Sequence, residues 1–388
     1  MRILYLSFYF EPDLSAGSFR NTSLAKELAK QCVKDCNIDI ITSKPNRYSS
    51  FKVEALSKEE VENITVHRID LPSHKNGMFD QVHSFREYFV KTLKITNNVK
   101  YDLVFASSSR LFTAYLGLVI ARKQSIPLYL DIRDIFVDTM DDVLKSKLVK
   151  TAVLPFLKVI EKRTFSYATH INLISEGFKS YFEKYKKTNF SFFTNGIDDV
   201  FLNNNNISSR NGSGVMTITY AGNIGEGQGL HKIVPQAAAK LGDNYKFRII
   251  GDGGAKNVLN EEIDKLGVAN VELTPPVSRE ELLEIYRDSD FLFLHLNDYD
   301  AFKKVLPSKI FELATYDKPI IAGVGGYANK FISENVSNTI LFNPCDVAAM
   351  VSGLQNYNYV NEKRECFISK FSRANINRDM AKSILNYL

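Results

Sequence analysis

Short apolar runs of strand length recur along the chain, and segments with apolar residues at helical spacing separate them. This alternation predicts an α/β protein in which parallel sheets are covered by helices on both faces. In the first half we predict strands at Arg2–Phe10, Ile38–Thr42, Ile64–Leu71, Asp102–Ser107, Pro127–Asp131 and His170–Ser175. The pattern restarts in the second half with Met216–Asn223, Tyr245–Gly251, Asp290–Leu296, Pro319–Ala322 and Thr339–Asn343.

The 388 residues are too many for one ordinary domain and suit two. A polar run rich in Asn, Ser and Gly, without periodicity, separates the halves and is typical of a linker. We therefore predict domains at residues 1–202 and 215–374 with a linker at 203–214. The pattern at 375–388 is helical.

The stretch Pro307–Ala322 combines a helix start with a short apolar strand. Ser308 suits the N-cap, and Lys309 and Glu312 are three residues apart, so both project to one side. A lysine at a helix N-terminus suits a diphosphate, and a carboxylate one turn deeper can accept hydrogen bonds from a ribose. On spacing alone, an ordinary capped helix with a surface Lys–Glu pair is the better explanation.

The same stretch reads Pro-Ser-Lys-x-x-Glu followed by Lys-Pro-Ile-Ile-Ala, and it resembles the nucleotide-sugar motif of retaining glycosyltransferases of family 4. The resemblance extends over nearly the whole chain. Within the family, the chain is most similar in kind to bacterial surface-polysaccharide transferases of the L-fucosamine type. The resemblance implies the GT-B fold, in which two Rossmann-like domains face each other across a cleft, with 375–388 crossing back to the first. The donor-binding residues that it implies are Gly222, Asn223, Gly225, Gly229, Gly251, Asp252, Gly253, Pro307, Ser308, Lys309 and Glu312.

In the first domain, loops at the carboxyl ends of predicted strands are candidates for the acceptor side. The resemblance assigns Gly17, Arg20 and Asp134 there, and it assigns catalytic roles to Asp131, Arg133 and Lys309. The charged loop after Pro127–Asp131 also fits a structural ion pair between Arg133 and an aspartate. Thr194–Asp198 is similar to the family's entry into the interdomain hinge.

Two departures from the family are visible. Lys304 stands where the first of two donor-site glutamates belongs, and Gln228 stands where a basic residue precedes the last loop glycine. We consider Lys303, Lys304, His231 and Lys232 as replacement cations. Asp298 and Asp300 have the Asp-x-Asp form of metal-dependent transferases, but the family does not need it, so no metal and no cofactor are expected.

Composition excludes other classes. A net charge of +5 without a basic run or motif does not indicate nucleic acid. No apolar run is long enough for a transmembrane helix, the start does not resemble a signal peptide, and a cytoplasmic protein with reduced cysteines is expected. Two segments that mix lysines with apolar and aromatic residues, 145–163 and 179–193, suit either amphipathic core helices or contact with the anionic inner membrane.

The resulting hypothesis is a retaining transferase that moves a sugar from a nucleoside diphosphate, UDP by resemblance, to a glycan that is lipid-linked by resemblance. A GT-B sugar-nucleotide epimerase and an inactive sugar-nucleotide-binding protein remain as alternatives, the latter because of the two departures. An oxidoreductase is disfavoured, since the loop after the first strand lacks the Gly-x-Gly-x-x-Gly pattern.

Overall fold

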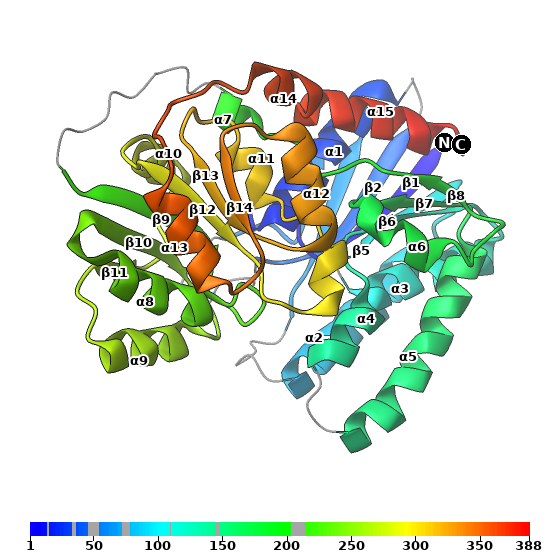
Figure 1. The fold of residues 1–388 in the computed structure, drawn as a ribbon. Helices are drawn as coiled ribbons and strands as arrows, with labels where there is room; N and C mark the ends of the chain where they lie inside the picture. The colour runs from blue at the N-terminus through cyan, green and yellow to red at the C-terminus, as the bar shows by residue number, and fades with distance from the viewer. Residues whose placement is uncertain are drawn as a thin grey trace. The chain divides into compact units, whose positions relative to one another are not determined.

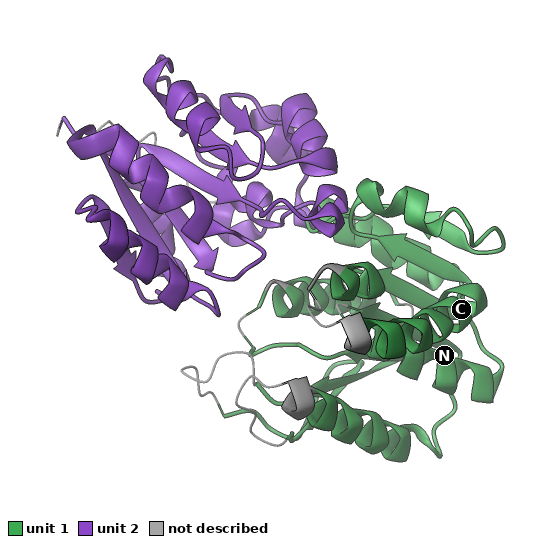
Figure 2. Ribbon diagram, turned by 60° about the horizontal axis from the view of Figure 1, so that its bottom comes forward, with its two compact units in different colours: residues 1–195, 374–388 green, residues 196–373 purple. Residues whose placement is uncertain are grey.

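The computed structural model describes residues 1–13, 15–32, 36–45, 54–71, 78–108, 110–143, 147–202 and 214–388. They form two compact units (Figure 2), of which unit 1 comprises Met1–Asn195 and Ala374–Leu388, and unit 2 comprises Gly196–Arg373. The predicted linker at 203–214 lies outside the described residues except for Gly214. The chain passes between the units at Asn195–Gly196 and again at Arg373–Ala374.

Unit 1 is built on an eight-stranded sheet in the order β3-β4-β2-β1-β5-β6-β7-β8 (Figure 1). The strands are β1 (Arg2–Ser7), β2 (Asn37–Ser43), β3 (Lys58–Val61), β4 (Ile64–Ile69), β5 (Leu103–Ser108), β6 (Leu128–Ile132), β7 (His170–Leu173) and β8 (Asn189–Ser191). All pairs are parallel except β3–β4. The six predicted strands are confirmed. The pattern did not indicate β3 or β8, because these short edge strands contain no buried residue and need no apolar run.

Helices cover both faces of this sheet. They are α1 (Ala16–Gln31), α2 (Met78–Thr96), α3 (Leu111–Gln124), α4 (Phe136–Val143), α5 (Lys147–Tyr167), α6 (Lys179–Phe182) and α15 (Arg373–Leu385). Ile3 and Tyr5 of β1 share one core with Leu24 of α1 and Met380 of α15. Because side chains alternate along a strand, the intervening residues of β1 face the other side, where α3 contacts β1 and β5.

Unit 2 has a six-stranded parallel sheet in the order β11-β10-β9-β12-β13-β14. Its strands are β9 (Met216–Asn223), β10 (Tyr245–Asp252), β11 (Val271–Thr274), β12 (Phe291–His295), β13 (Ile320–Gly323) and β14 (Thr339–Phe342). The helices are α7 (Asp199–Leu202), α8 (Leu230–Leu241), α9 (Lys256–Leu266), α10 (Arg279–Arg287), α11 (Lys309–Leu313), α12 (Gly326–Asn335), α13 (Val347–Gln355) and α14 (Glu365–Lys370). Two apolar clusters, one with α8, α9 and α13 and one with α10, α11, α12 and α14, cover opposite faces.

Backbone hydrogen bonds and ion pairs attach the segment that follows the first crossing to the rest of unit 2. The Ile197 N–H donates to the Phe371 carbonyl at 2.7 Å, and the Arg373 N–H donates to the Ile197 carbonyl at 3.0 Å. The Asp198 carboxylate accepts from Arg373 Nη1 at 2.9 Å and also pairs with Arg279. These bonds therefore join the two chain segments of unit 2 that lead to the crossings.

One expectation about cysteines is wrong. The structure joins Cys32 and Cys36 in a disulfide, with Cα atoms 5.7 Å apart, a separation within the usual range for such bonds. Cys345 and Cys366 are free thiols. In the parts of the chain that the structure describes, none of the helices has the length and apolar character that a membrane span requires.

Candidate functional site

The sheet of unit 2 has one point where successive connections change direction. β9 lies between β10, which follows it in sequence, and β12, which comes after β11 at the far edge. Ligands of open parallel sheets bind beyond the carboxyl ends of the strands at such a switch point. The loops after β9 and β12 border this point, and the predicted donor residues Gly222, Asn223, Gly225 and Gly229 lie on the first of them.

The glycine loop after β9 is closed by its own side chains. Asn223 Nδ2 donates to Gln228 Oε1 at 2.8 Å. Gln228, which stands where the family has a basic residue, therefore bridges the loop. Gly229 adopts a left-handed conformation with φ of 59° where α8 begins, and a Cβ there would lie 3.0 Å from Asn297 Cγ. Gly229 is thus required both by the turn and by close contact with the loop after β12.

The glycines after β10 have a packing reason of their own. A Cβ on Gly251 would collide with the Gly222 carbonyl oxygen, and one on Gly253 would lie 2.5 Å from the Ile224 carbonyl oxygen. Asp252 Oδ1 accepts from the Gly253 N–H at 2.9 Å. Close approach of the two strand ends therefore accounts for Gly251 and Gly253 before any ligand is considered.

His295, at the end of β12, fastens the glycine loop to the segment after β14. Its Nε2 accepts from the Cys345 N–H at 2.9 Å, so the proton lies on Nδ1, which donates to the Gln228 carbonyl at 2.6 Å. Burial lowers the pKa of His295 to about 4, so the ring is neutral at physiological pH. Sequence reasoning missed this residue; the available signal was a polar side chain ending an apolar strand.

The predicted phosphate and ribose ligands lie together on α11. Lys309 Nζ donates to Glu312 Oε2 at 2.8 Å, and each side chain is about one quarter exposed, at 24% and 26%. Burial opposes the charge of Lys309, but the Glu312 carboxylate outweighs it and the pKa of the lysine is raised. The Lys309 ammonium also lies close enough to Tyr220 to counteract the burial that raises the tyrosine pKa. The Tyr220 hydroxyl donates to the Asn223 carbonyl at 2.7 Å, within the end of β9.

One detail of the helix prediction is wrong. Ser308 occupies the N-cap position after Pro307 but makes no capping hydrogen bond, and α11 itself has five residues. Ser308 already has helical backbone angles, which turn its hydroxyl away from the N–H groups that a cap would bind. A helix this short has a small dipole, which contributes little to binding a phosphate. Any attraction for a phosphate here therefore has to come from the charge of Lys309.

Of the candidate replacement cations, Lys232 lies between the β9 and β12 loops. Its Nζ donates to Asn297 Oδ1 at 3.0 Å and lies 3.9 Å from Glu226 Oε1. Lys303 instead forms an exposed pair with Asp300 at 2.7 Å. Among the described residues no group of three or more His, Cys, Asp or Glu side chains is arranged to hold a metal ion.

In unit 1, Asp131 and Arg20 lie in the interior of the fold, and the catalytic role of Asp131 and the acceptor-side role of Arg20 stay predictions. Both side chains are fully buried, with 0% and 1% exposed, and form an ion pair at 3.0 Å. Asp131 also accepts from Ser107 Oγ at 3.1 Å and from Asn172 Nδ2 at 2.8 Å. Arg20 further donates to the Thr194 carbonyl at 2.6 Å, one residue before the chain leaves the unit. These contacts fit a structural ion pair, and its cation is Arg20 rather than the expected Arg133.

Arg133 and Gly17 do lie together. A Cβ on Gly17 would collide with the Arg133 guanidinium, so glycine in the first turn of α1 leaves room for that group. Arg133 Nε is buried and has no hydrogen-bond partner among the described residues, and burial lowers the pKa of the side chain. Asp134 is exposed on the same loop. A catalytic role for Arg133 and an acceptor-side role for Gly17 and Asp134 stay predictions.

Comparison with solved structures identifies the architecture. The chain is similar over its full length to Anabaena Alr3699/HepE in complex with UDP-glucose, with a TM-score of 0.70, 14% identity and 100% of both chains covered. It is also similar to the lipopolysaccharide outer core galactosyltransferase WaaB, with a TM-score of 0.65, 12% identity and 100% of both chains covered. The chain has the GT-B fold.

Sequence comparison adds a family to the second GT-B unit. Residues 205–370, which lie within unit 2, match the family model "Glycosyl transferases group 1". A putative colanic acid biosynthesis glycosyl transferase, WcaI of Escherichia coli (strain K12), is 36% identical over 94 residues. That match spans 24% of this chain and 23% of the relative, so the chain is matched over about a quarter of that protein's length.

Proposed function

We propose that the protein is a retaining glycosyltransferase that moves a sugar from a nucleoside diphosphate donor, UDP-linked, to a hydroxyl of a lipid-linked glycan in surface-polysaccharide biosynthesis. One observation carries the proposal: in the unit that matches the group 1 glycosyltransferase model, the switch point between β9 and β12 is bordered by a glycine loop and Lys232, with Lys309 beside the end of β9. The similar Anabaena protein, solved with UDP-glucose, supports the donor class.

In this proposal Lys309 acts on the leaving diphosphate and Glu312 on the ribose. The lysine has its positive charge secured by the adjacent carboxylate, because the pair raises its pKa. Fixed positive charge aimed at the developing phosphate charge is the contribution that most often dominates such transfers. Glu312 holds the ammonium in place and retains one oxygen, Oε1, that could accept from a ribose hydroxyl.

The acceptor is proposed to be recognised by unit 1, with Gly17, Arg133 and Asp134 as candidates. Contact with an anionic membrane is proposed for α5, which exposes apolar residues beside lysines. Phe156 is 61% exposed and Val159 is 48% exposed, although Leu154 and Leu157 of the same helix are buried. A helix with apolar residues on its solvent side as well as its core side suits attachment to a lipid surface.

Two alternatives are weighed against transfer. A GT-B epimerase would use the same donor site without an acceptor. An inactive sugar-nucleotide-binding protein is favoured by the Lys309–Glu312 pair itself, since an ion pair between the two predicted ligands also fits a purely structural helix.

The deciding experiment measures donor binding and then turnover. UDP-sugars are screened by thermal shift, where a ligand at 100 times its dissociation constant adds about 2.7 kcal/mol of stability. For the donor that binds, sugar release that rises with added glycan supports transfer, an epimeric product supports epimerisation, and binding without turnover supports the inactive protein. Lys309→Ala is expected to lower turnover by roughly tenfold to a thousandfold. Unchanged turnover in a folded Lys309→Ala variant removes this residue from the phosphate site.

A further inference from the structure

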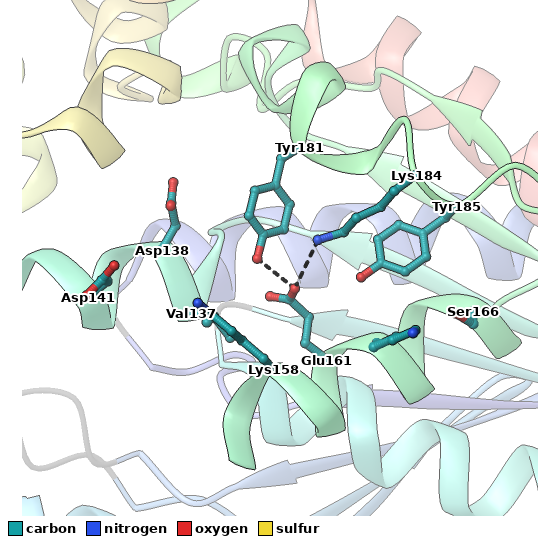
Figure 3. A pocket seen from close by; sticks show the side chains of 10 residues that line it. Val137, Asp138, Asp141, Lys158, Glu161, Ser166, Tyr181, Lys184 and Tyr185 are labelled. Atoms are coloured by element: carbon teal, nitrogen blue, oxygen red, sulfur yellow. Dashed lines mark hydrogen bonds and ion pairs between the residues drawn. The ribbon is translucent and has the colours of Figure 1, made fainter. Parts of the chain in front are cut away.

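Unit 1 contains a pocket with charged and tyrosine side chains in its lining, and no part of the proposed donor site uses it. Its cavity has a volume of about 670 Å³ and is enclosed by α4, α5, α6 and the turn after α6 (Figure 3). The lining residues that matter below are Lys158, Glu161, Lys162, Tyr181, Lys184 and Tyr185. The volume is ample for a small hydroxylated ligand.

A buried carboxylate forms one wall of this pocket. Glu161 is 3% exposed, and its Oε1 accepts from the Tyr181 hydroxyl at 2.6 Å and lies 3.8 Å from Lys184 Nζ (Figure 3). The Lys184 ammonium also sits over the rings of Tyr181 and Tyr185, at 4.1 and 5.2 Å from their centroids. Lys184 is therefore engaged in holding this wall together. Burial raises the pKa of Glu161.

A second polar group in the pocket lacks a partner. Tyr185 is 6% exposed, and its hydroxyl is buried without a hydrogen bond to any described residue. In Figure 3 this hydroxyl points to the same interior as the Glu161 carboxylate. Buried hydroxyls are nearly always hydrogen-bonded in native proteins, so an unpartnered one beside a cavity indicates a missing polar ligand.

Two lysines on α5 supply positive charge at the mouth. Lys158 and Lys162 are four residues apart, so they are neighbours on one face of the helix, and both are exposed. No carboxylate of the described chain lies within ion-pair distance of either ammonium. Two more carboxylates, Asp138 and Asp141, also line the pocket, and Asp141 pairs with Lys150 at 3.3 Å. Since neither carboxylate pairs with Lys158 or Lys162, the charge of these two lysines is available to an anion at the mouth.

We propose that this pocket binds a sugar phosphate, with sugar hydroxyls on Glu161 and Tyr185 and the phosphate on Lys158 and Lys162. A carboxylate is a strong acceptor for sugar hydroxyls, and two ammonium groups one turn apart match the charge and size of a phosphate. The Tyr181 ring offers an apolar surface to the sugar face. Free glycosyl phosphates and the sugar-phosphate end of a lipid-linked glycan share this chemistry. The inference does not require the transfer reaction, since every residue involved belongs to unit 1.

The test is isothermal titration of the full chain with glucose 1-phosphate. The double variant Lys158→Ala/Lys162→Ala should weaken binding at least tenfold, and Tyr185→Phe, which removes one hydroxyl, should weaken it about threefold to tenfold. The matched control is Lys186→Ala/Lys187→Ala, which removes two exposed charges from the neighbouring turn and should bind as the wild type does.

Three results would overturn the inference. They are the absence of binding, equal binding of inorganic phosphate with no effect of Tyr185→Phe, and a loss of affinity in Lys309→Ala with none in Lys158→Ala/Lys162→Ala. The last result would assign the ligand to the donor site instead. A second titration, with glucose on a short water-soluble prenyl diphosphate, separates the two sources. Tighter binding that depends on Lys158 and Lys162 supports a lipid-linked ligand, and binding no tighter than that of glucose 1-phosphate supports a free glycosyl phosphate.

Discussion

Asp131→Asn tests whether the buried Arg20–Asp131 pair is structural. The wild-type carboxylate accepts from Arg20 Nη2 and Nε at 3.0 and 3.1 Å, from Ser107 at 3.1 Å and from Asn172 at 2.8 Å. Each oxygen serves Arg20 and one further donor, so the asparagine NH₂ group meets donors whichever way it turns. The substitution also leaves the Arg20 charge without its counter-ion in a site with no exposed surface.

The cost should be large on the scale of a domain. Breaking a buried ion pair by removing one partner destabilises proteins by about 3–5 kcal/mol, against a total stability of about 5–15 kcal/mol. Arg20 also binds the carbonyls of Phe193 and Thr194, so the loss should spread to the segment before the first crossing. Unit 1 is therefore expected to unfold at clearly lower denaturant concentration.

The assay is urea unfolding followed by far-UV circular dichroism, because the chain has no tryptophan. Hydrogen exchange of β6 peptides assigns the transition to unit 1. Asp134→Asn is the matched control: desolvation raises the pKa of this carboxyl on the same loop to about 6, so neutralising it should not lower stability. The apolar pair Arg20→Met/Asp131→Leu should recover much of the loss. If Asp131→Asn unfolds within about 1 kcal/mol of the wild type yet loses turnover, the structural interpretation is refuted and the catalytic one returns.

Three further predictions concern unit 2. Glu312→Gln should raise the donor dissociation constant about fivefold, since a neutral amide is a weaker acceptor; an unchanged constant with a lower melting temperature would indicate a structural helix. Donor turnover should persist in excess chelator and in Asp298→Asn/Asp300→Asn, and its abolition by chelator, restored by manganese, would contradict the lysine-based account. Because burial lowers the pKa of His295 to about 4 from 6.5, the unfolded state takes up the proton first and stability falls as pH drops from 6.5 towards 4. His295→Gln should remove about 2 kcal/mol of the stability difference between pH 7.5 and 5 measured by urea unfolding, and an identical pH profile would show that the ring does not titrate in this way.

The pattern of apolar residues was sufficient to predict the α/β class and most of the sheet strands. β9 begins and ends where the sequence indicated, at Met216 and Asn223, because an apolar run bounded by polar and glycine-rich loops has few alternatives. Edge strands such as β3 were not predictable, since a strand that is half solvated carries no apolar signature. The Lys309–Glu312 proximity also followed from sequence, because three residues along a helix bring side chains together whatever the rest of the fold does.

Contacts between distant segments could be decided only by the tertiary structure. Arg20 and Asp131 are 111 positions apart, and the charged loop after β6 offered Arg133 as the nearer partner; only the packing of α1 against the sheet brings the guanidinium of Arg20 to the carboxylate. His295 gained its role in the same way, since its two partners, Gln228 and Cys345, come from loops after β9 and β14. The pocket around Glu161 needs three helices to enclose it. Local spacing determines which side chains share a face of one element, but burial and pairing depend on which elements the fold places against it.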